Sequence, residues 1–173
     1  MIGMRERTLR AGHVTLRLLV DGDASALREL LRLREVTEPA GFLPAGDDSA
    51  FERFFDTLTQ YDTGLAILCE DTLVGYIHVY PYDPEMPEYV GKTCVGMGFV
   101  IGKEYWGHGY ASEALRTLTA YLKTRFDHCF VDHFEGNAAS KRVIEKCGYR
   151  YCDTYTMRFD ALGREMTCLS YVF

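Results

Sequence analysis

The sequence has 173 residues, of which 25% are charged and 47% hydrophobic, and its net charge is −6. This length suffices for one domain with a sizeable core, so we expect a single domain over residues 1–173. The negative charge argues against a nucleic-acid partner and favours a cationic one. No apolar run approaches the roughly 20 residues that a membrane-spanning helix needs, so we expect no membrane partner.

The cysteines and histidines show no pattern of a disulfide framework or a metal site. Six cysteines are scattered without any C-x-x-C, and the five histidines are not grouped with other ligand types. We therefore expect free thiols and no metal ion. The N-terminal stretch MIGMRERTLRAGH lacks the apolar core of an export signal, so we expect a cytoplasmic protein.

The first third of the chain predicts one strand and two helices. Apolar residues alternate over 13–20, which predicts a strand. Residues 21–23 contain two aspartates that can cap a helix, and 35–48 is a proline- and glycine-rich loop without a clear period. The apolar stripes of the two helices are formed by Leu27, Leu30 and Leu31, and by Phe51, Phe54, Phe55 and Leu58.

Three strands follow. Residues 65–70 and 73–80 read as two strands joined by a tight turn. Three prolines and three acids make 81–88 an exposed acidic loop. Residues 93–101 form the next strand, in which Gly96 and Gly98 indicate a bulge or a place where another chain or a ligand lies close.

The last part of the chain predicts two helices and three strands. A helix follows Gly109, with an apolar stripe, and 128–134 is a short strand. Asn137 begins a second helix, which ends at Gly148. Residues 151–159 and 165–173 form a closing hairpin around 160–164.

Gly107 and Gly109 form a turn directly before a helix. Such a turn leaves the first helical N–H groups free beside the positive end of the helix dipole, which suits a phosphate or pyrophosphate. The alternative is a turn that merely starts a helix. The sequence does not match the dinucleotide fingerprint, because Ser112 replaces its third glycine, nor the Walker loop, because Met86 replaces its first.

The stretch FVIGKEYWGHGYASEALR at 99–116 resembles the acyl-CoA-binding motif of the GNAT N-acetyltransferases, [RQ]-x-x-G-x-[GA]. Gly109 matches the motif glycine and Ala111 the final small residue, whereas Trp106 stands where Arg or Gln is usual. Residues 105–114 are similar to a phrase of the branch that includes ribosomal-protein N-terminal (alanine) acetyltransferases. The resemblance implies an α/β (α+β) GNAT fold, a mixed and mostly antiparallel sheet of about seven strands flanked by four helices.

The same resemblance implies that acetyl-CoA is the acyl donor. The residues that it places near this substrate are Phe99, Val100, Ile101, Trp106, Gly107, His108, Gly109, Tyr110, Ala111, Ser112, Asn137 and Lys141. Asn137 would bind the pantetheine arm, although a plain helix cap also explains it. Lys141 and Arg142 would pair with the phosphates, although solvated charges are the simpler explanation.

A proton donor and a proton acceptor are needed for acetyl transfer to an amine. Many GNAT members carry a tyrosine seven residues after the asparagine, but Ile144 stands there. The resemblance assigns the catalytic role to Ser140 instead, which would donate to the CoA thiolate. Hydrogen bonding at the helix start is the alternative reading of Ser140, and Tyr149 and Tyr110 are substitute donors.

The sequence leaves the general base open. Glu88, His78 and His133 are candidates, and none of them is preferred.

The resemblance therefore predicts an acetyl-CoA-dependent N-acetyltransferase that acts by direct attack within a ternary complex. The acceptor would be a primary amine, either a small molecule or a protein N-terminus, and the chain a monomer or a homodimer. The alternative is a catalytically inactive acyl-CoA-binding sensor module, which would account for the absent tyrosine and the unassigned base. The presence of Ser140 favours the enzyme.

Overall fold

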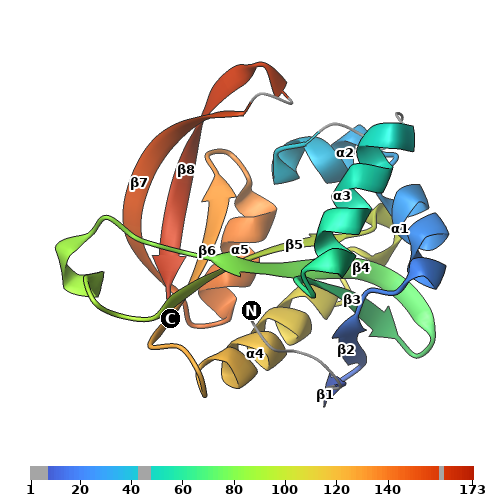
Figure 1. Ribbon diagram of the computed structural model, residues 1–173, viewed down its shortest axis with the longest axis horizontal. Helices are drawn as coiled ribbons and strands as arrows, with labels where there is room; N and C mark the ends of the chain where they lie inside the picture. The colour runs from blue at the N-terminus through green and yellow to red at the C-terminus, as the bar shows by residue number, and fades with distance from the viewer. Residues whose placement is uncertain (1–7, 43–47, 160–161) are drawn as a thin grey trace.

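A computed structural model describes residues 8–42, 48–159 and 162–173. Over these ranges the chain forms one eight-stranded sheet of order β1-β2-β3-β4-β5-β6-β8-β7 (Figure 1). All neighbouring strands are antiparallel except β5 and β6. The strands are β1 Leu9–Ala11, β2 Val14–Leu18, β3 Gly64–Cys69, β4 Thr72–Pro81, β5 Cys94–Ile101, β6 His128–Phe134, β7 Arg150–Phe159 and β8 Arg164–Val172.

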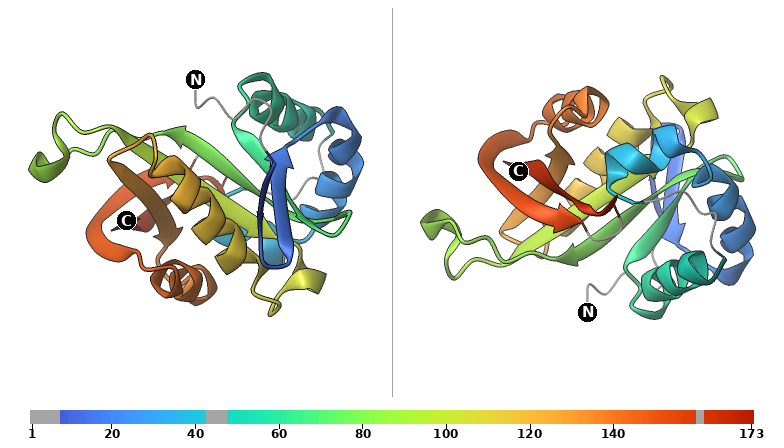
Figure 2. Two further views of the ribbon diagram at one scale, coloured as in Figure 1. Left: turned by 90° about the horizontal axis from the view of Figure 1, so that it is seen from below. Right: turned by 90° about the horizontal axis from the view of Figure 1, so that it is seen from above.

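Helices cover both faces of the sheet (Figure 2). The α-helices are α1 Ala24–Leu30, α2 Arg34–Thr37, α3 Asp48–Gln60, α4 Tyr110–Leu122 and α5 Ala138–Lys146. The 3-10 turns are η1 Asp21–Asp23, η2 Glu38–Ala40, η3 Pro87–Tyr89 and η4 Lys103–Tyr105. Residues of α1, α2 and α3 share one apolar core, and α4 and α5 share another on the opposite face. None of the helices in the described ranges is long and apolar enough to span a bilayer.

The mixed, mostly antiparallel sheet that the sequence predicted is confirmed, but the described residues hold eight strands and five α-helices instead of seven and four. The predicted strand over 13–20 is the second arm of a hairpin, which turns at Gly12 with φ +59°. The three-residue β1 is too short to show an alternating pattern. The predicted loop over 35–48 contains α2 and η2, since burial of Val36 and Thr37 stabilises a helical turn there. Residues 43–47 of that loop, and 160–161 of the closing turn, lie outside the described residues.

The predicted capping by the aspartates at 21–23 is found one turn earlier: Asp23 makes no side-chain cap of α1 itself, but its carboxylate accepts the backbone N–H of Val20 at the start of η1 and also binds Arg17. The two guanidinium nitrogens lie 2.6 and 2.9 Å from the Asp23 carboxylate oxygens, and Val20 N donates to the same carboxylate at 2.9 Å. Burial acts to raise the pKa of Asp23, but the hydrogen bonds from Arg17 and Val20 outweigh it, so this pKa lies below its usual value. The contact joins the end of β2 to the start of α1.

The remaining predicted elements are confirmed within a few residues. Glu70 adopts φ +53° in the tight turn between β3 and β4, and Gly148 adopts φ +90° just after α5. The Asn137 side chain caps α5 by accepting a hydrogen bond from Ser140 N at 3.1 Å. All six cysteines are free.

The feature that positions the site is the separation of β5 from β6. Their parallel register runs from Cys94 paired with His128 to Met97 paired with Val131, and then stops. Beyond Met97, β5 continues along β4 to Ile101, while β6 continues along β8. The two halves of the sheet therefore diverge, and Figure 1 shows the β7–β8 hairpin and helices α1 to α3 on opposite sides of the opening.

We predict that Arg17→Met lowers the free energy of unfolding at pH 7 by about 2 kcal/mol, because it leaves the buried Asp23 carboxylate without its charged donor. The folded-state pKa of Asp23 is depressed, so the pair stabilises the fold above the unfolded-state pKa of about 4 and loses that effect as the pH falls through the folded-state value. Urea unfolding of both proteins from pH 7 to pH 3 measures the difference.

The control is Arg32→Met. Arg32 pairs with Glu29 on the surface, with both side chains more than 60% exposed, and should change stability by no more than about 0.5 kcal/mol. Equal losses in the two variants would contradict the assignment.

Candidate active site

A cavity of about 1050 Å³ lies where β5 and β6 separate. It has two sides. The helix side is lined by the glycine turn, the start of α4 and α5: Gly107, Gly109, Tyr110, Ala111, Ser112, Ser140, Arg142, Val143 and Lys146. The aromatic side is lined by residues of α3, β4, β6, β7 and β8 and adjoining loops: Phe42, Phe54, Tyr76, His78, Tyr80, Tyr82, Asp132, Phe134, Tyr155, Met157, Phe159 and Cys168.

The edge of β5 beside the cavity has free backbone groups. Gly102 N donates to Val74 O on β4 at 2.9 Å. The N–H and C=O groups of successive residues point to alternate edges of an antiparallel strand. Those of Gly102 point toward β4, so those of Phe99 and Ile101 point toward the other edge of β5, where β6 no longer pairs with it. Trp106 Nε1 donates a hydrogen bond to Ile101 O at 2.8 Å, so this carbonyl already has a partner. The N–H and C=O of Phe99 therefore remain available to an extended amide-containing ligand.

The glycine turn opens the helix side to a ligand. Gly107 and Gly109 adopt φ values of +82° and +84°, which L-residues rarely adopt, and a Cβ built on either would meet no atom within 4 Å. The first intrahelical bond of α4 is donated by Glu113 to Gly109 O. The preceding N–H groups, from Tyr110 to Ser112, consequently have no helical acceptor. Such a turn is suited to an anionic group.

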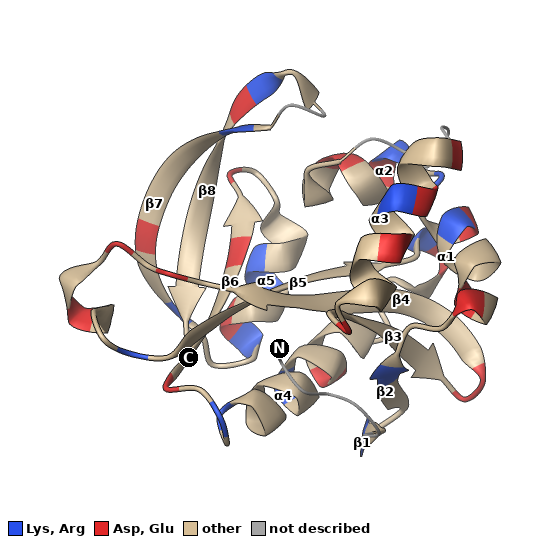
Figure 3. Cartoon of the chain, viewed as in Figure 1, with Lys and Arg blue, Asp and Glu red and all other residues tan. Residues whose placement is uncertain are grey.

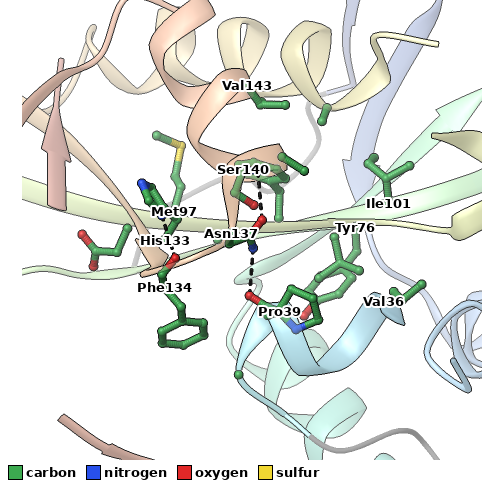
Figure 4. A pocket seen from close by; sticks show the side chains of 18 of the residues that line it. Val36, Pro39, Tyr76, Met97, Ile101, His133, Phe134, Asn137, Ser140 and Val143 are labelled. Carbon is green, nitrogen blue, oxygen red and sulfur yellow. Dashed lines mark hydrogen bonds between the residues drawn. The ribbon is translucent and has the colours of Figure 1, made fainter. Parts of the chain in front are cut away.

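Both ends of the Asn137 amide are engaged (Figure 4). Its oxygen caps α5 at Ser140 N, and its nitrogen donates to Pro39 O at 2.9 Å. Asn137 therefore links α5 to η2 across the opening. The Ser140 hydroxyl is half-buried, lines the cavity and has no hydrogen-bond partner among the described residues.

The two substitute proton donors, Tyr149 and Tyr110, differ in their position relative to the cavity. Tyr149 does not line the cavity; its hydroxyl lies 2.6 Å from Thr119 Oγ1, and burial raises its pKa. Tyr110 does line the cavity, and its pKa is raised, chiefly by hydrogen bonding with Cys69.

Two residues that the sequence placed near acetyl-CoA lie outside the cavity lining, whereas all the others line it. His108 Nδ1 lies 3.2 Å from Tyr105 O, and Lys141 Nζ lies 3.8 Å from a Glu145 oxygen. The cations that do line the helix side are Arg142 and Lys146. Figure 3 shows basic positions on α5 and an acidic position within β6.

The three candidate bases differ in their surroundings. Glu88 lies in η3 and does not line the cavity. His133 lines it, but its ring nitrogens lie 2.9 Å from Phe134 O and 3.4 Å from the Tyr171 hydroxyl. His78 also lines it, burial lowers its pKa to about 4, and its buried Nδ1 has no partner.

Asp132 is a cavity residue that the sequence reasoning missed. Its Oδ2 accepts a hydrogen bond from the Tyr155 hydroxyl at 2.9 Å. Burial raises its pKa, and the hydroxyls of Ser170 and Tyr155 only partly offset this effect. The sequence feature that could have identified Asp132 is an acidic residue inside an apolar strand. Asp132 lies two residues from both Phe130 and Phe134, so its side chain is on the same face of the strand as theirs.

Gly96 and Gly98 of β5 leave space for aromatic side chains of the neighbouring strand β4. Tyr76, His78 and Tyr80 follow one another with ring centroids 5.8 and 5.5 Å apart. A Cβ on Gly96 would lie 2.2 Å from the Tyr80 ring, and one on Gly98 would lie 2.5 Å from the His78 ring. A bulge is wrong because the β4–β5 register is continuous. The groups that lie close to these glycines are the protein's own Tyr80 and His78 rings; whether another chain or a ligand also lies close stays a prediction.

The comparisons with known proteins agree with this arrangement. Residues 13–150 match the model of the GNAT acetyltransferase domain. An uncharacterised N-acetyltransferase of Schizosaccharomyces pombe is 29% identical over 82 residues, which cover 47% of this chain and 44% of that protein. The matched segment thus spans less than half the length of that relative.

Two solved structures share the fold over nearly the whole chain. An acetyltransferase of the GNAT family from Bacillus anthracis gives a TM-score of 0.80 at 19% identity, covering 96% of this chain and 98% of that one. A ribosomal-protein α-N-acetyltransferase in complex with coenzyme A gives 0.71 at 13% identity, covering 95% and 97%. Because the family model matches most of the sequence, this chain belongs to the GNAT acetyltransferase family.

Proposed function

We propose that this protein is an acetyl-CoA-dependent N-acetyltransferase that moves an acetyl group to a primary amine by direct attack in a ternary complex. The observation that carries the proposal is the juxtaposition of an open β5 edge with a glycine turn at a helix start, both on one cavity. Acetyl-CoA combines an anionic pyrophosphate with an amide-containing arm, and the two features suit these two parts.

In this assignment the pyrophosphate binds the N–H groups of residues 107–111, and Arg142 and Lys146 supply positive charge on the same side. The amide-containing arm pairs with the free N–H and C=O of Phe99, as an added strand does. The thioester then lies at the opening between β5 and β6, where both sides of the cavity meet. Binding the two substrates next to each other supplies proximity without a covalent enzyme intermediate.

Ser140 is the proton donor that we propose for the departing thiolate. Ile144, the position of the tyrosine in many family members, is fully buried in the core. Ser140 lies one turn earlier, and its hydroxyl faces the cavity. Transfer forms a C–N bond and breaks the C–S bond; one proton leaves the nitrogen, and the Ser140 hydroxyl gives one to the sulfur.

We predict that Gly109→Val weakens acetyl-CoA binding by at least about tenfold, or about 1.4 kcal/mol, because the side chain would occupy the space for the pyrophosphate. Isothermal titration calorimetry measures this affinity. Gly91→Val is the matched control, since Gly91 has φ +76°, its Cβ would also meet no atom, and it does not line the cavity. Valine is strained at the positive φ of either glycine, so both variants carry this cost. Equal affinities of the two variants for acetyl-CoA would therefore contradict the placement of the pyrophosphate at Gly109.

We predict that Ser140→Ala lowers kcat by about 10²-fold, at the lower end of the range for general acid catalysis, since a thiolate is a fair leaving group. Affinity for acetyl-CoA should stay within about twofold. Stability should also persist, because the cap of α5 uses the backbone N–H of Ser140 and not its hydroxyl. Asn137→Ala, which removes the cap itself, should cost about 1 kcal/mol.

The measurements are steady-state kinetics and thermal melting on each variant. A Ser140→Ala protein with wild-type kcat would exclude Ser140 as the donor and direct the search to Tyr110.

A further inference from the structure

Two buried side-chain atoms in the described ranges lack a hydrogen-bond partner, and both belong to residues of the same cavity. They are His78 Nδ1 and Asp132 Oδ1. Most buried polar atoms in folded proteins have a partner, so each such exception needs an explanation. Because both residues line the aromatic side, a polar group of a ligand on that side supplies a common explanation.

Asp132 also lacks a counter-ion among the residues that the structure describes. The hydroxyls that act on it, those of Tyr155 and Ser170, are neutral. The described cations that line the cavity, Arg142 and Lys146, are on α5 at the helix side. A largely buried carboxylate without a cation is costly for the fold. A cationic ligand would provide the missing charge.

The surroundings of Asp132 specify the rest of the ligand. Tyr80, Tyr82 and Tyr155 line the same side, and Phe134 packs edge-on against Phe159 with centroids 4.7 Å apart. Aromatic rings of this kind attract a cation and bury an apolar body. These rings offer few hydrogen-bond partners for the N–H and C=O groups of a peptide backbone, so they suit a peptide acceptor less well.

The number of charges limits the ligand further. Among the described residues, the other carboxylate that lines the cavity is Glu35, and it already pairs with Lys103 at 2.8 Å. The one uncompensated carboxylate in this part of the chain matches a ligand with one positive charge better than a polyamine.

Building on the function proposed above, we propose that the acceptor is a primary monoamine carried on an apolar or aromatic body, and that Asp132 is the residue that binds its ammonium group. The carboxylate takes one proton from the ammonium and later releases it to solvent. The neutral amine attacks the thioester carbonyl, and a second proton leaves the nitrogen to replace the one that Ser140 gives to the thiolate. The amide retains the third hydrogen, so the products are the acetamide, CoA as a thiol and one released proton.

The test uses the full chain with acetyl-CoA and three acceptors: 2-phenylethylamine, spermidine and a short peptide with an N-terminal alanine. Release of CoA is followed with a thiol reagent, and binding of acetyl-CoA and of 2-phenylethylamine is followed by calorimetry. We expect 2-phenylethylamine to have a kcat/KM at least about tenfold above the other two acceptors. This comparison requires no variant.

Asp132→Asn keeps the shape of the side chain and removes its charge. It should lower kcat/KM for 2-phenylethylamine by at least about 10²-fold, the lower end of what a positioned base contributes, with acetyl-CoA affinity within about twofold. The matched control is Asp153→Asn on β7. Asp132 on β6 and Asp153 on β7 both lie opposite Ser170 of β8, but Asp153 does not line the cavity. It should keep the wild-type kcat/KM within about threefold.

The outcomes separate the two proposals. If acetyl-CoA binds but the peptide or spermidine is preferred, or 2-phenylethylamine neither binds nor is acetylated, the acceptor class is wrong while the acetyltransferase assignment stands. If Asp132→Asn and Asp153→Asn behave alike, Asp132 is not the amine-binding residue. If acetyl-CoA itself does not bind, the proposed function fails, and the acceptor assignment fails with it.

Discussion

The parallel pairing of β5 with β6 ends after four residue pairs, and the rest of the cavity depends on that break. Each strand keeps its other neighbour, so β5 continues on β4 and β6 on β8 without loss of those ladders. The cost is a strand edge whose backbone groups need other partners. Trp106 supplies one of them at Ile101 O, and the groups of Phe99 remain open. An interrupted sheet thus provides a binding edge inside a well-packed core.

Contacts across the opening hold the two halves of the sheet in place. Asn137 links α5 to Pro39 on the far side, and it does so with the amide that also caps its own helix. Gly96 and Gly98 let the rings of Tyr80 and His78 lie directly against β5. Within the described residues, the cavity therefore has a basic helix side and an aromatic side with a single uncompensated carboxylate. That asymmetry suits the reaction that we propose, between an anionic acyl donor and a cationic acceptor.

Local patterns predicted most of the fold. The glycine turn before α4, the Asn137 cap and the apolar stripes all lie within short stretches, where spacing determines the outcome. The missed elements depend on tertiary contacts. β1 is three residues that gain order by pairing with β2, and α2 is one turn stabilised by burial of Val36. Asp23 was predicted as a cap; its carboxylate accepts Val20 N at the start of η1, and the contact with Arg17 on β2 is the tertiary part that the local pattern does not show.

Most of the site residues that the sequence predicted lie on the helix side and the β5 edge, because those are covered by local patterns. On the aromatic side the sequence named His78, as one of three candidate bases without preference. Residues 99–111 are contiguous, so one motif covers the open edge and the glycine turn. The aromatic side combines β4, β6, β7 and β8, and the sequence does not show that Tyr155 contacts Asp132 or that His78 lies against Gly98. The environments of His78 and His133 differ through burial and ring contacts, which their sequence neighbours do not reveal.

Amide hydrogen exchange with and without acetyl-CoA tests the central claim, that the separated edge of β5 and the glycine turn together bind the acyl donor. The exchange rates of the peptides that cover 98–101 and 107–112 should fall when acetyl-CoA is added, because their free N–H groups gain acceptors. Peptides from β2 and β3, which are fully paired on the far side of the sheet, should not change. Saturating acetyl-CoA with no protection at 98–101, or with protection only elsewhere, would contradict the account.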